Sequence, residues 1–252
     1  MTLEILTSDA LSPFRHGFFT RRGGASSGVF AGLNCGFGSS DQREIVAINR
    51  LRVARAMEVA PDALRGVNQV HSDIAVAAGP DAPAAPPDAD ALATATPGIA
   101  LAVLTADCMP ILFCDPESGV VGAAHAGWRG ALGGVIEATL ASMEELGARR
   151  DAIRAVIGPC ISQRAYEVGP DLKDAFRAAD HEADRFFVGG KGDRLHLDLP
   201  GYGLSRLRRA GVAAAEWIGQ CTYHDDARFY SYRRSSHRRE ADYGRLVSVI
   251  RA

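Results

Sequence analysis

The sequence predicts an α/β fold with mixed sheets of α+β character, and three features carry this prediction. Short apolar or β-branched runs recur along the chain, and segments with helically spaced apolar residues lie between them. The two kinds of segment do not alternate in a strict βαβ rhythm. Continuous apolar runs are typical of strands covered on both faces, so we expect a layered structure rather than a barrel.

Six runs are predicted as strands because each is short and rich in apolar residues. They are residues 74–78, 99–106, 110–115, 119–126, 153–158 and 245–250. Four segments between or beside them are predicted as helices, namely 41–58, 130–146, 170–179 and 203–210. The third begins with a proline, which suits a first helical turn, and Gly147 and Gly211 are expected to end the second and the fourth.

The first predicted helix has a recognisable start and an apolar stripe. Asp41 stands where a capping side chain is favoured. The apolar face is predicted from residues that fall on one side of the helix: Ile45, Ile48, Leu51 and Val53.

Length and composition indicate one catalytic domain over residues 1–252. A chain of 252 residues is ordinary for a single α/β domain. Its one low-complexity stretch, residues 77–91, is rich in Ala, Pro and Asp. Because its prolines disfavour both helix and central strand, we expect an exposed loop there.

Charge and cysteine content indicate which partners and which cellular compartment to expect. The net charge of −2 and the 23% of charged residues argue against disorder and against a nucleic-acid partner. The sequence shows neither a signal peptide nor a membrane-spanning apolar run. Five cysteines without a close CxxC pair indicate free thiols. We therefore expect a cytoplasmic monomer or small homo-oligomer with no membrane partner.

Three metal-capable side chains lie at the ends of predicted strands. His71 precedes the run 74–78, Cys108 follows the run 99–106, and His125 is near the end of the run 119–126. Strand ends are where a rigid scaffold presents functional groups. Two imidazoles and one thiolate suit zinc, and three protein ligands leave a fourth position for water or substrate.

Other interpretations of these three side chains remain open from residue type alone. Each histidine fits a half-buried, hydrogen-bonded imidazole, and Cys108 fits a small core residue. Cys108 could also be the nucleophile of a cysteine hydrolase with His125 as its base. A further hypothesis is a scaffold protein whose structural zinc takes a fourth ligand, drawn from Cys160, Cys221 or His224.

Two glycine-rich segments are candidates for anion binding. Arg21 and Arg22 precede the pair Gly23–Gly24, and Arg129 stands near a predicted helix start. Arginine forks and exposed backbone N–H groups match phosphate oxygens. The alternative for the first segment is a hairpin turn with exposed arginines.

Several motifs together resemble one known family. They include HGFFTRRGG, NQVHS, LTADCMPILFCD, AHAGWRGALGG, IGPCIS, CTY and SYRR, and they extend from about Phe14 to about Ile250. The chain is similar to the multicopper polyphenol oxidoreductases, or laccase-like proteins, which include the peptidoglycan editing factor. TADC followed by AHAGWRG is the most specific part of this resemblance.

The resemblance implies a fold, a metal site and an activity. The fold would be a four-layer α/β/β/α sandwich like that of toxins with a Cys–His pair. The ligands, which are also the expected catalytic residues, would be His71, Cys108 and His125, holding Zn²⁺. The substrates would be purine nucleosides and phosphate: phosphorolysis of adenosine, inosine, guanosine and methylthioadenosine, and deamination of adenosine.

Supporting residues are expected around this site. Arginines would orient the phosphate, and the candidates are Arg22, Arg50, Arg129 and Arg233. Asn34 and Asp107 are expected to support the ligands, and Asp107 would orient a histidine unless it is only a turn residue.

Two alternative activities follow from the same family. One is a cysteine amidohydrolase that edits a peptidoglycan precursor. The other is a copper polyphenol oxidase, since two His and one Cys also suit a type-one copper. A laccase needs further coppers held by closely spaced histidine pairs, and the seven histidines here include no HxH pair. Oxidase activity is therefore the least favoured of the three.

Overall fold

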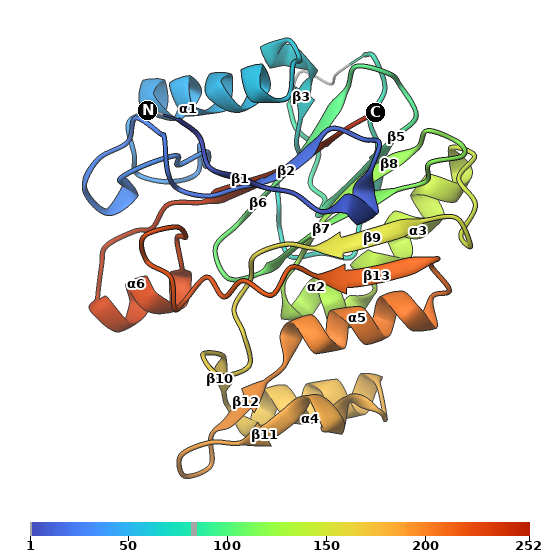
Figure 1. Ribbon diagram of the computed structural model, residues 1–252. Helices are drawn as coiled ribbons and strands as arrows, with labels where there is room; N and C mark the ends of the chain where they lie inside the picture. The colour runs from blue at the N-terminus through green and yellow to red at the C-terminus, as the bar shows by residue number, and fades with distance from the viewer. Residues whose placement is uncertain (1, 82–84) are drawn as a thin grey trace.

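The computed structural model describes residues 2–81 and 85–252 and places two large sheets face to face (Figure 1). The first sheet has five strands in the order β1-β2-β14-β6-β3. Their bounds are β1 Ile5–Leu6, β2 His16–Phe19, β14 Leu246–Arg251, β6 Ala100–Thr105 and β3 Leu64–Arg65. All neighbours are antiparallel except β3 and β6, which run parallel.

The second sheet has six strands in the order β13-β9-β7-β8-β5-β4. Their bounds are β13 Ala214–Trp217, β9 Arg154–Ile157, β7 Met109–Cys114, β8 Val121–Ala126, β5 Ala91–Thr94 and β4 Ala75–Ala77. The two outer pairs are parallel and the inner pairs antiparallel, so the sheet is mixed.

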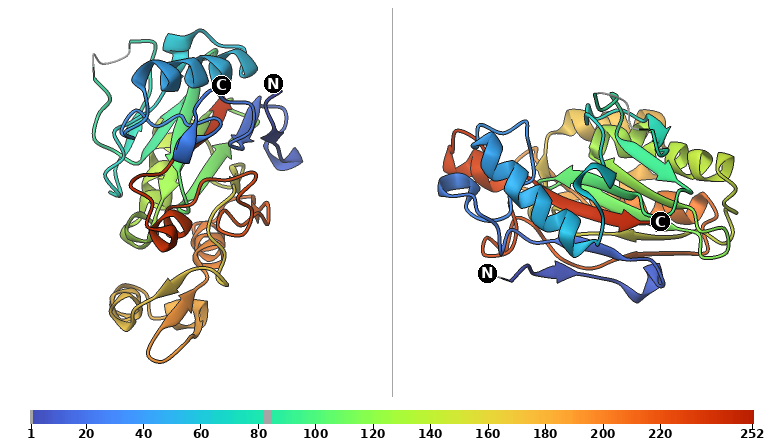
Figure 2. Two further views of the ribbon diagram at one scale, coloured as in Figure 1. Left: turned by 90° about the vertical axis from the view of Figure 1, so that its left-hand side faces the viewer. Right: turned by 90° about the horizontal axis from the view of Figure 1, so that it is seen from above.

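Helices cover the outer faces of both sheets (Figures 1 and 2). Helix α1 (Arg43–Ala56) lies on the first sheet. Helices α2 (Trp128–Gly133), α3 (Val135–Glu145) and α5 (Leu199–Arg209) lie on the second. Short α6 (Tyr232–Arg238) precedes the last strand. The 3₁₀ turns are Asp9–Leu11, Gly28–Phe30, Pro61–Ala63 and Ala183–Phe186.

A small third sheet projects beside α5 (Figure 2). Its strands β10 (Glu167–Val168), β12 (Leu195–Leu197) and β11 (Phe187–Gly189) are antiparallel. Helix α4 (Pro170–Ala179) packs with it, and Phe176 contacts Phe187 and Tyr202 through aromatic edges. This unit is thus joined to the core through α5.

Alternation along the central strands separates three buried layers. In β6, Leu101 and Val103 face the second sheet, whereas Ala100 and Ala102 face α1. In β7, Leu112 faces the first sheet, whereas its neighbours face the helices on the other side. Successive strand residues point to opposite faces, so these apolar runs are buried on both sides. The result is the four-layer α/β/β/α sandwich that the family resemblance implies; the comparison with Cys–His toxins stays a prediction.

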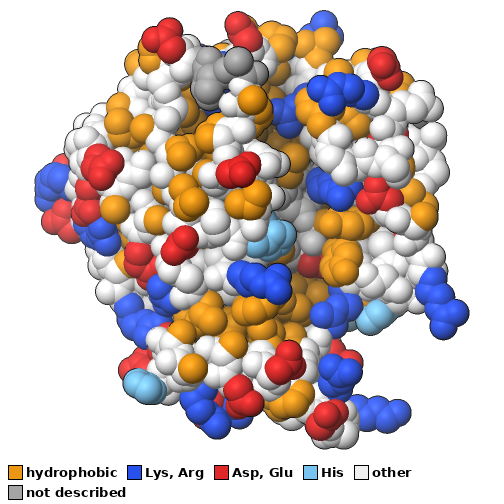
Figure 3. All heavy atoms as spheres, turned by 180° about the vertical axis from the view of Figure 1, so that it is seen from behind, with side chains coloured by type: hydrophobic (Ala, Val, Ile, Leu, Met, Phe, Trp, Pro, Cys, Tyr) orange, Lys and Arg blue, Asp and Glu red, His pale blue; other side chains and the backbone are white. Residues whose placement is uncertain are grey.

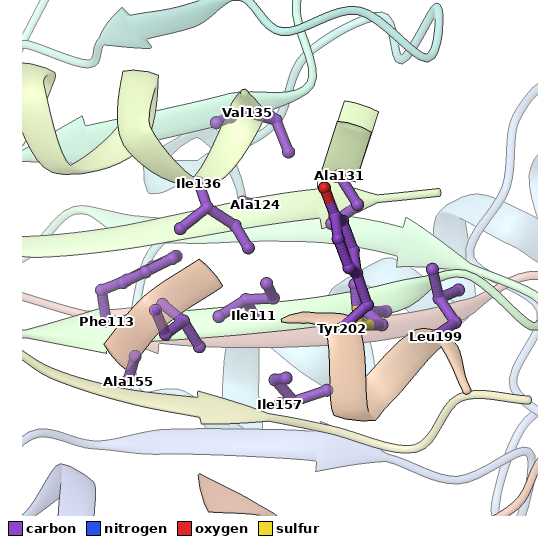
Figure 4. Close-up of a cluster of buried hydrophobic side chains, with 14 of the residues drawn as sticks. Ile111, Phe113, Ala124, Ala131, Val135, Ile136, Ala155, Ile157, Leu199 and Tyr202 are labelled. Atoms are coloured by element: carbon purple, nitrogen blue, oxygen red, sulfur yellow. The ribbon is translucent and has the colours of Figure 1, made fainter. Parts of the chain in front are cut away.

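The layer between the second sheet and its helices contains Tyr202, the largest of the fully buried side chains among the described residues (Figure 4). Tyr202 of α5 is fully buried, and its hydroxyl end lies beside Ala131 of α2. Its hydroxyl accepts a hydrogen bond from Arg206 Nη1, so burial leaves that polar group satisfied.

All six predicted strands are confirmed within one or two residues, and the helices are confirmed with corrections. The predicted helix 130–146 is two helices, because Gly134 adopts a φ of 114° between α2 and α3. The fourth helix begins earlier than expected, where the Asp198 side chain caps it. The strands β1–β3, β5 and β10–β13 are not among the predicted runs, because none is longer than four residues.

The predicted apolar face of α1 is only partly correct. Val53 is buried and Ile45 and Leu51 are half-buried, but Ile48 is exposed, and Val46 and Asn49 are buried instead. Asn49 turns inward because its amide bonds the backbone of Ala25 and Asn34, which a hydrophobicity pattern does not reveal. The N-cap of α1 is Gln42 rather than Asp41.

The predicted loop 77–91 is only partly a loop. Its first residue ends β4 and its last begins β5, and residues 82–84 lie outside the described part. Ala89 and Asp90 are fully buried rather than exposed. Among the described residues, no helix has the length and apolarity to cross a membrane.

Candidate functional site

The predicted metal ligands come together at one end of the sandwich. His71 lies in the connection from β3 to β4, Cys108 lies in the connection from β6 to β7, and His125 is the penultimate residue of β8. The first two connections pass from one large sheet to the other. One ligand atom of each residue lies within 4.8 Å of the others. We call these three residues the ligand trio.

Burial is graded across the ligand trio. His125 is buried, Cys108 is half-buried and His71 is exposed, so the trio opens to solvent on the His71 side. Cys108 Sγ lies 3.9 Å from His71 Nε2, and the two imidazole rings meet edge to face at 4.7 Å between centroids.

This donor set fits a zinc ion. Zinc binds sulfur at about 2.3 Å and imidazole nitrogen at about 2.1 Å, so two donors 3.9 Å apart are within reach of one ion. Among the described residues, the group includes no fourth His, Cys, Asp or Glu. That composition is typical of a catalytic rather than a structural zinc site.

Asp90 connects two members of the ligand trio. Its Oδ1 accepts a hydrogen bond from His125 Nδ1 at 2.7 Å, which leaves His125 Nε2 for a metal. Its Oδ2 accepts bonds from Val70 N, Ser72 N and Ser72 Oγ at 3.2, 2.5 and 2.8 Å. These bonds hold the loop on which His71 adopts a left-handed φ of 62°. One carboxylate therefore fixes both histidines.

The pKa values at the site follow from this arrangement. Burial opposes ionisation of Cys108, but the charge and hydrogen bond of His125, with a bond from His71, lower its pKa to about 7. Burial likewise opposes the His125 cation, but Cys108 and Asp90 raise its pKa to about 9. Burial would raise the pKa of Asp90, yet the bonds from His125 and Ser72 lower it to about 2. Thiolate, the metal-binding form, is thus accessible near neutral pH.

Gly127 permits the close approach of Cys108 and His71. A Cβ on Gly127 would lie 3.0 Å from Cys108 Sγ and 2.9 Å from His71 Cδ2. Contacts this short are essentially absent for real Cβ atoms, so one or both ligands would have to move. The glycine after His125 is therefore part of the site although it offers no ligand atom.

Gly127→Ala is expected to weaken metal binding by about tenfold or more, the scale seen when supporting contacts of metal ligands are lost. The measurement is metal affinity by competition with a chromophoric chelator. Gly133→Ala is the matched control, because its Cβ would meet only Asp73 at 3.5 Å or more. Equal affinities of the two variants would contradict the role given to Gly127.

The ligand trio lines a cleft of about 710 Å³. This volume is in the range of small-molecule sites. The cleft passes the edge of the first sheet. Besides the ligand trio and three glycines, its walls are apolar residues, an amide pair, one threonine and three arginines: Leu64, Val67, Ala102, Leu104, Ala106, Pro86, Phe37, Tyr243, Asn68, Gln69, Thr105, Arg50, Arg65 and Arg245. Figure 3 shows a hollowed face with Lys and Arg side chains gathered around the hollow.

Of the predicted phosphate-binding arginines, only Arg50 lines this cleft. Arg22 lines a separate hollow and pairs with Glu4 at 3.4 Å, so the structure does not bring it to this cleft, and phosphate binding by Arg22 stays a prediction. Arg129 is exposed and stacks on Trp128. Arg233 stacks near Tyr166 and donates to the carbonyl of Glu167. Neither is a wall residue of the cleft.

Asp107 and Asn34 support backbone rather than ligands. Asp107 adopts a φ of 87°, and its carboxylate accepts bonds from Thr222 Oγ1, Ser231 Oγ and Arg233 N. It anchors the turn that presents Cys108, but the expectation that it orients a histidine is wrong. Asn34 Oδ1 accepts bonds from the backbone N–H groups of Gly36 and Arg245, two residues that line the cleft.

The proposed fourth ligands lie elsewhere. Cys160 is fully buried and pairs with Cys221 through an isolated backbone bridge. Cys221 Sγ accepts a hydrogen bond from Ser162 Oγ at 3.0 Å. His224 lines a separate hollow of about 450 Å³ with Gln163, Arg164, Val188 and His196. The described residues thus give no support to a closed, four-ligand site.

Sequence reasoning missed Asp90, Gly127, Gln69 and Arg245. Gln69 accepts from Leu104 N and donates to Leu104 O, both at 2.7 Å, and so continues the pairing of β6 beyond β3. A signal for two of them is present in the sequence, because Gln69 lies within NQVHS and Gly127 lies within AHAGWRGALGG. Asp90 had no such signal, because it lies in a stretch that looks like a polar loop.

The chain has close relatives among known proteins. It is 45% identical to a purine nucleoside phosphorylase of Deinococcus radiodurans, over 93% of this chain and 88% of that one. It is 43% identical to one of Pseudomonas aeruginosa, over 92% and 90%. The solved structure of a Neisseria meningitidis protein matches with a TM-score of 0.88 at 35% identity, over 100% and 99% of the two chains.

A second solved structure, YlmD of Geobacillus stearothermophilus, matches with a TM-score of 0.87 at 30% identity, over 97% and 93%. The family model described as multi-copper polyphenol oxidoreductase laccase matches residues 15–252 and therefore includes the whole ligand trio. With this match and these relatives, the chain belongs to the multi-copper polyphenol oxidoreductase laccase family.

Proposed function

We propose that this chain is a single-domain, zinc-dependent purine nucleoside phosphorylase that also deaminates adenosine. The observation that carries the proposal is the three-ligand donor set at one end of a cleft lined by arginines. The names of its relatives, at 36–45% identity over most of the chain, support the substrate class. Adenosine, inosine, guanosine and methylthioadenosine are the proposed nucleosides.

The proposed phosphorolysis exchanges one bond for another. A phosphate oxygen bonds to the anomeric carbon, the bond from that carbon to the purine nitrogen breaks, and the purine leaves with the electron pair and takes up a proton. Bound zinc, held by His71, Cys108 and His125, would supply Lewis acidity toward a substrate oxygen. Asp90 keeps His125 in the orientation that ligation requires.

The cleft supplies the remaining parts of the mechanism. The guanidinium of Arg50 offers a positive charge for phosphate. Apolar walls such as Val67 and Leu104 exclude water from the reacting atoms and pack against a flat base. Zinc as the metal and adenosine deamination rest on the family resemblance, whereas action in the cytoplasm rests on the free thiols that the cysteine content indicates. The experiment below tests the requirement for zinc.

A cysteine amidohydrolase acting on a peptidoglycan precursor is the second candidate. One observation favours it: Cys108, His125 and Asp90 form a connected thiol–imidazole–carboxylate series. This alternative predicts activity without metal and inactivation by thiol alkylation. Polyphenol oxidation is not proposed, because the described residues present a single metal-capable group.

The test compares one protein preparation with its metal present and with its metal removed. Purified wild-type protein is analysed for bound metal and for phosphate-dependent release of purine from inosine and adenosine, before and after removal of metal by a chelator. We expect about one zinc per chain, turnover that ends with chelation, and recovery on adding zinc. Full phosphorolysis after complete metal removal would refute the zinc mechanism. Inertness toward every nucleoside would refute the phosphorylase and favour the amidohydrolase.

A further inference from the structure

Beyond the ligand trio, every charged side chain on the described wall of the cleft is an arginine. Three of its wall residues are arginines, Arg50, Arg65 and Arg245, and none of its described wall residues is Asp or Glu. The whole chain, in contrast, has a net charge of −2. A concave surface lined by one sign of charge concentrates ligands of the opposite sign. This cleft therefore favours an anionic ligand.

Arg50 is a half-buried cation with little to balance it. Its Nη1 donates to the carbonyl of Cys35 at 3.3 Å, and its guanidinium lies 5.3 Å from the ring centre of Phe37. No carboxylate oxygen of the described residues lies within 4.0 Å of its nitrogens. Burial lowers the pKa of Arg50, the direction expected for a desolvated cation. An anion in the cleft would compensate this cost.

Arg245 is held beside Arg50 by the same short segment, residues 34–36. Asn34 Oδ1 accepts a bond from Arg245 N, and the carbonyl of Cys35, the next residue, accepts the bond from Arg50. Gly36 leaves room for the Arg245 side chain, since a Cβ there would lie 2.6 Å from Arg245 Cδ. Arg245 pairs with Asp242 through Nη1 and stacks on Tyr243. Segment 34–36 thus holds the guanidinium of Arg50 and the backbone of Arg245, whereas Asp242 and the carbonyl of Tyr243 hold the guanidinium of Arg245.

Arg65, the third arginine, and Thr105 each have a buried polar atom without a hydrogen-bond partner among the described residues. Arg65 donates through Nη1 and Nη2 to the carbonyls of Asp62 and Pro80, but its buried Nε has no partner among the described residues. Thr105, which is 3% exposed, likewise has a buried Oγ1 without a described partner. Both residues line the cleft. Unpartnered buried polar atoms are rare in proteins unless a ligand or water satisfies them.

We propose that Arg50, Arg245 and Arg65 form a subsite for a phosphate group, placed on the arginine wall of the cleft and distinct from the ligand trio. This inference rests on the proposed function and names the residues that would take its anionic substrate. Planar guanidinium forks match the oxygens of a phosphate dianion. The group would be either free inorganic phosphate or the phosphoryl group of a nucleoside 5′-phosphate, since both offer the same oxygens.

The test measures binding of inorganic phosphate and of adenosine 5′-monophosphate, each alone, to purified wild-type protein by titration calorimetry. Arg50→Gln and Arg245→Gln are expected to raise the Kd by about tenfold or more, because a charge-assisted contact contributes at least about 1.4 kcal/mol. Arg43→Gln is the matched control: Arg43 lies on the same helix and stacks on the same Phe37 at 4.8 Å, but it is not a wall residue of the cleft. Cys108→Ala separates this subsite from phosphate held by metal, and its binding is expected to persist.

The pattern across the two ligands identifies the source of the phosphate group. Arginine-dependent binding of inorganic phosphate supports the subsite as one for free phosphate. Weak binding of inorganic phosphate with arginine-dependent binding of the nucleotide supports a subsite for a phosphorylated nucleoside. The inference is overturned if neither ligand depends on Arg50 and Arg245, or if Arg43→Gln weakens binding equally. Should Arg50→Gln fail to fold, Arg245→Gln and Arg65→Gln decide the outcome.

The calorimetry is independent of turnover, so it separates this inference from the proposed function. A protein that binds phosphate through Arg50 and leaves all nucleosides intact retains the subsite and loses the phosphorylase assignment. A protein that cleaves nucleosides, but whose phosphate binding is unchanged in the Arg50 and Arg245 variants, keeps the phosphorylase assignment and loses the subsite.

Discussion

Cys108→Ala is expected to remove both the bound metal and the phosphorolysis activity. The thiolate is one of three ligands, and the remaining two are an exposed and a buried imidazole. Metal ions supply several kcal/mol of charge stabilisation in the transition state. At about 1.4 kcal/mol per factor of ten, the loss is about 10³-fold or more. Metal content by mass spectrometry and initial rates of purine release are the two measurements.

Cys114→Ala is the matched control for this variant. Cys114 is fully buried at the opposite end of β7, and its thiol is not part of the ligand trio. Both variants lose one sulfur atom, but only Cys108→Ala is expected to lose metal. A Cys108→Ala protein that keeps zinc and full activity would show that the thiolate is neither ligand nor nucleophile.

Asp90→Asn is expected to lower metal affinity by about 10- to 100-fold, the range found for lost carboxylate partners of metal-bound histidines. The native carboxylate faces donors on both sides: His125 Nδ1 on one oxygen, and Val70 N, Ser72 N and Ser72 Oγ on the other. An amide must present its NH₂ to one of these sides. Either His125 takes the tautomer that protonates Nε2, or the His71 loop loses its acceptor.

Asp115→Asn is the control for Asp90→Asn, and the two variants are compared by their thermal stability and their metal affinity. Asp115 makes a comparable set of bonds, accepting from Glu117 N, Ser118 Oγ and Arg149 N, but it is not connected to the ligand trio. Each variant leaves a buried donor unsatisfied, which costs about 1–3 kcal/mol. We therefore expect Asp115→Asn to lower the melting temperature without changing the metal affinity. Equal metal affinities for the two variants would refute the role given to Asp90.

The sequence was most informative where a feature is local. Strands such as 110–115 are buried on both faces and therefore appear as unbroken apolar runs. The ligand trio was predicted because His71, Cys108 and His125 each lie at the end of such a run, within motifs of one family. The structure brings these three residues together as expected.

The parts that could not be predicted depend on contacts between distant segments. Asp90 is buried because it accepts a hydrogen bond from the loop that carries His71. Asn49 is buried because its amide bonds the backbone of residues 25 and 34. Arg22 and Arg50 look equivalent in the sequence, but Glu4 pairs with the first, and the second faces the cleft. Composition and periodicity contain no information about such partners.

The ligand trio lies where the chain leaves one large sheet for the other, and this placement links the site to the mechanics of the whole fold. The connections that carry His71 and Cys108 each begin at the first sheet and end at the second. An ion bound by the ligand trio would cross-link these two connections and so couple the positions of the two sheets. Shear between the sheets, for example from altered packing of Val103 against Leu112, would then change the distances among the ligands without touching the cleft. Substitutions in the layer between the sheets are therefore expected to affect metal binding and activity as well as the stability of the fold.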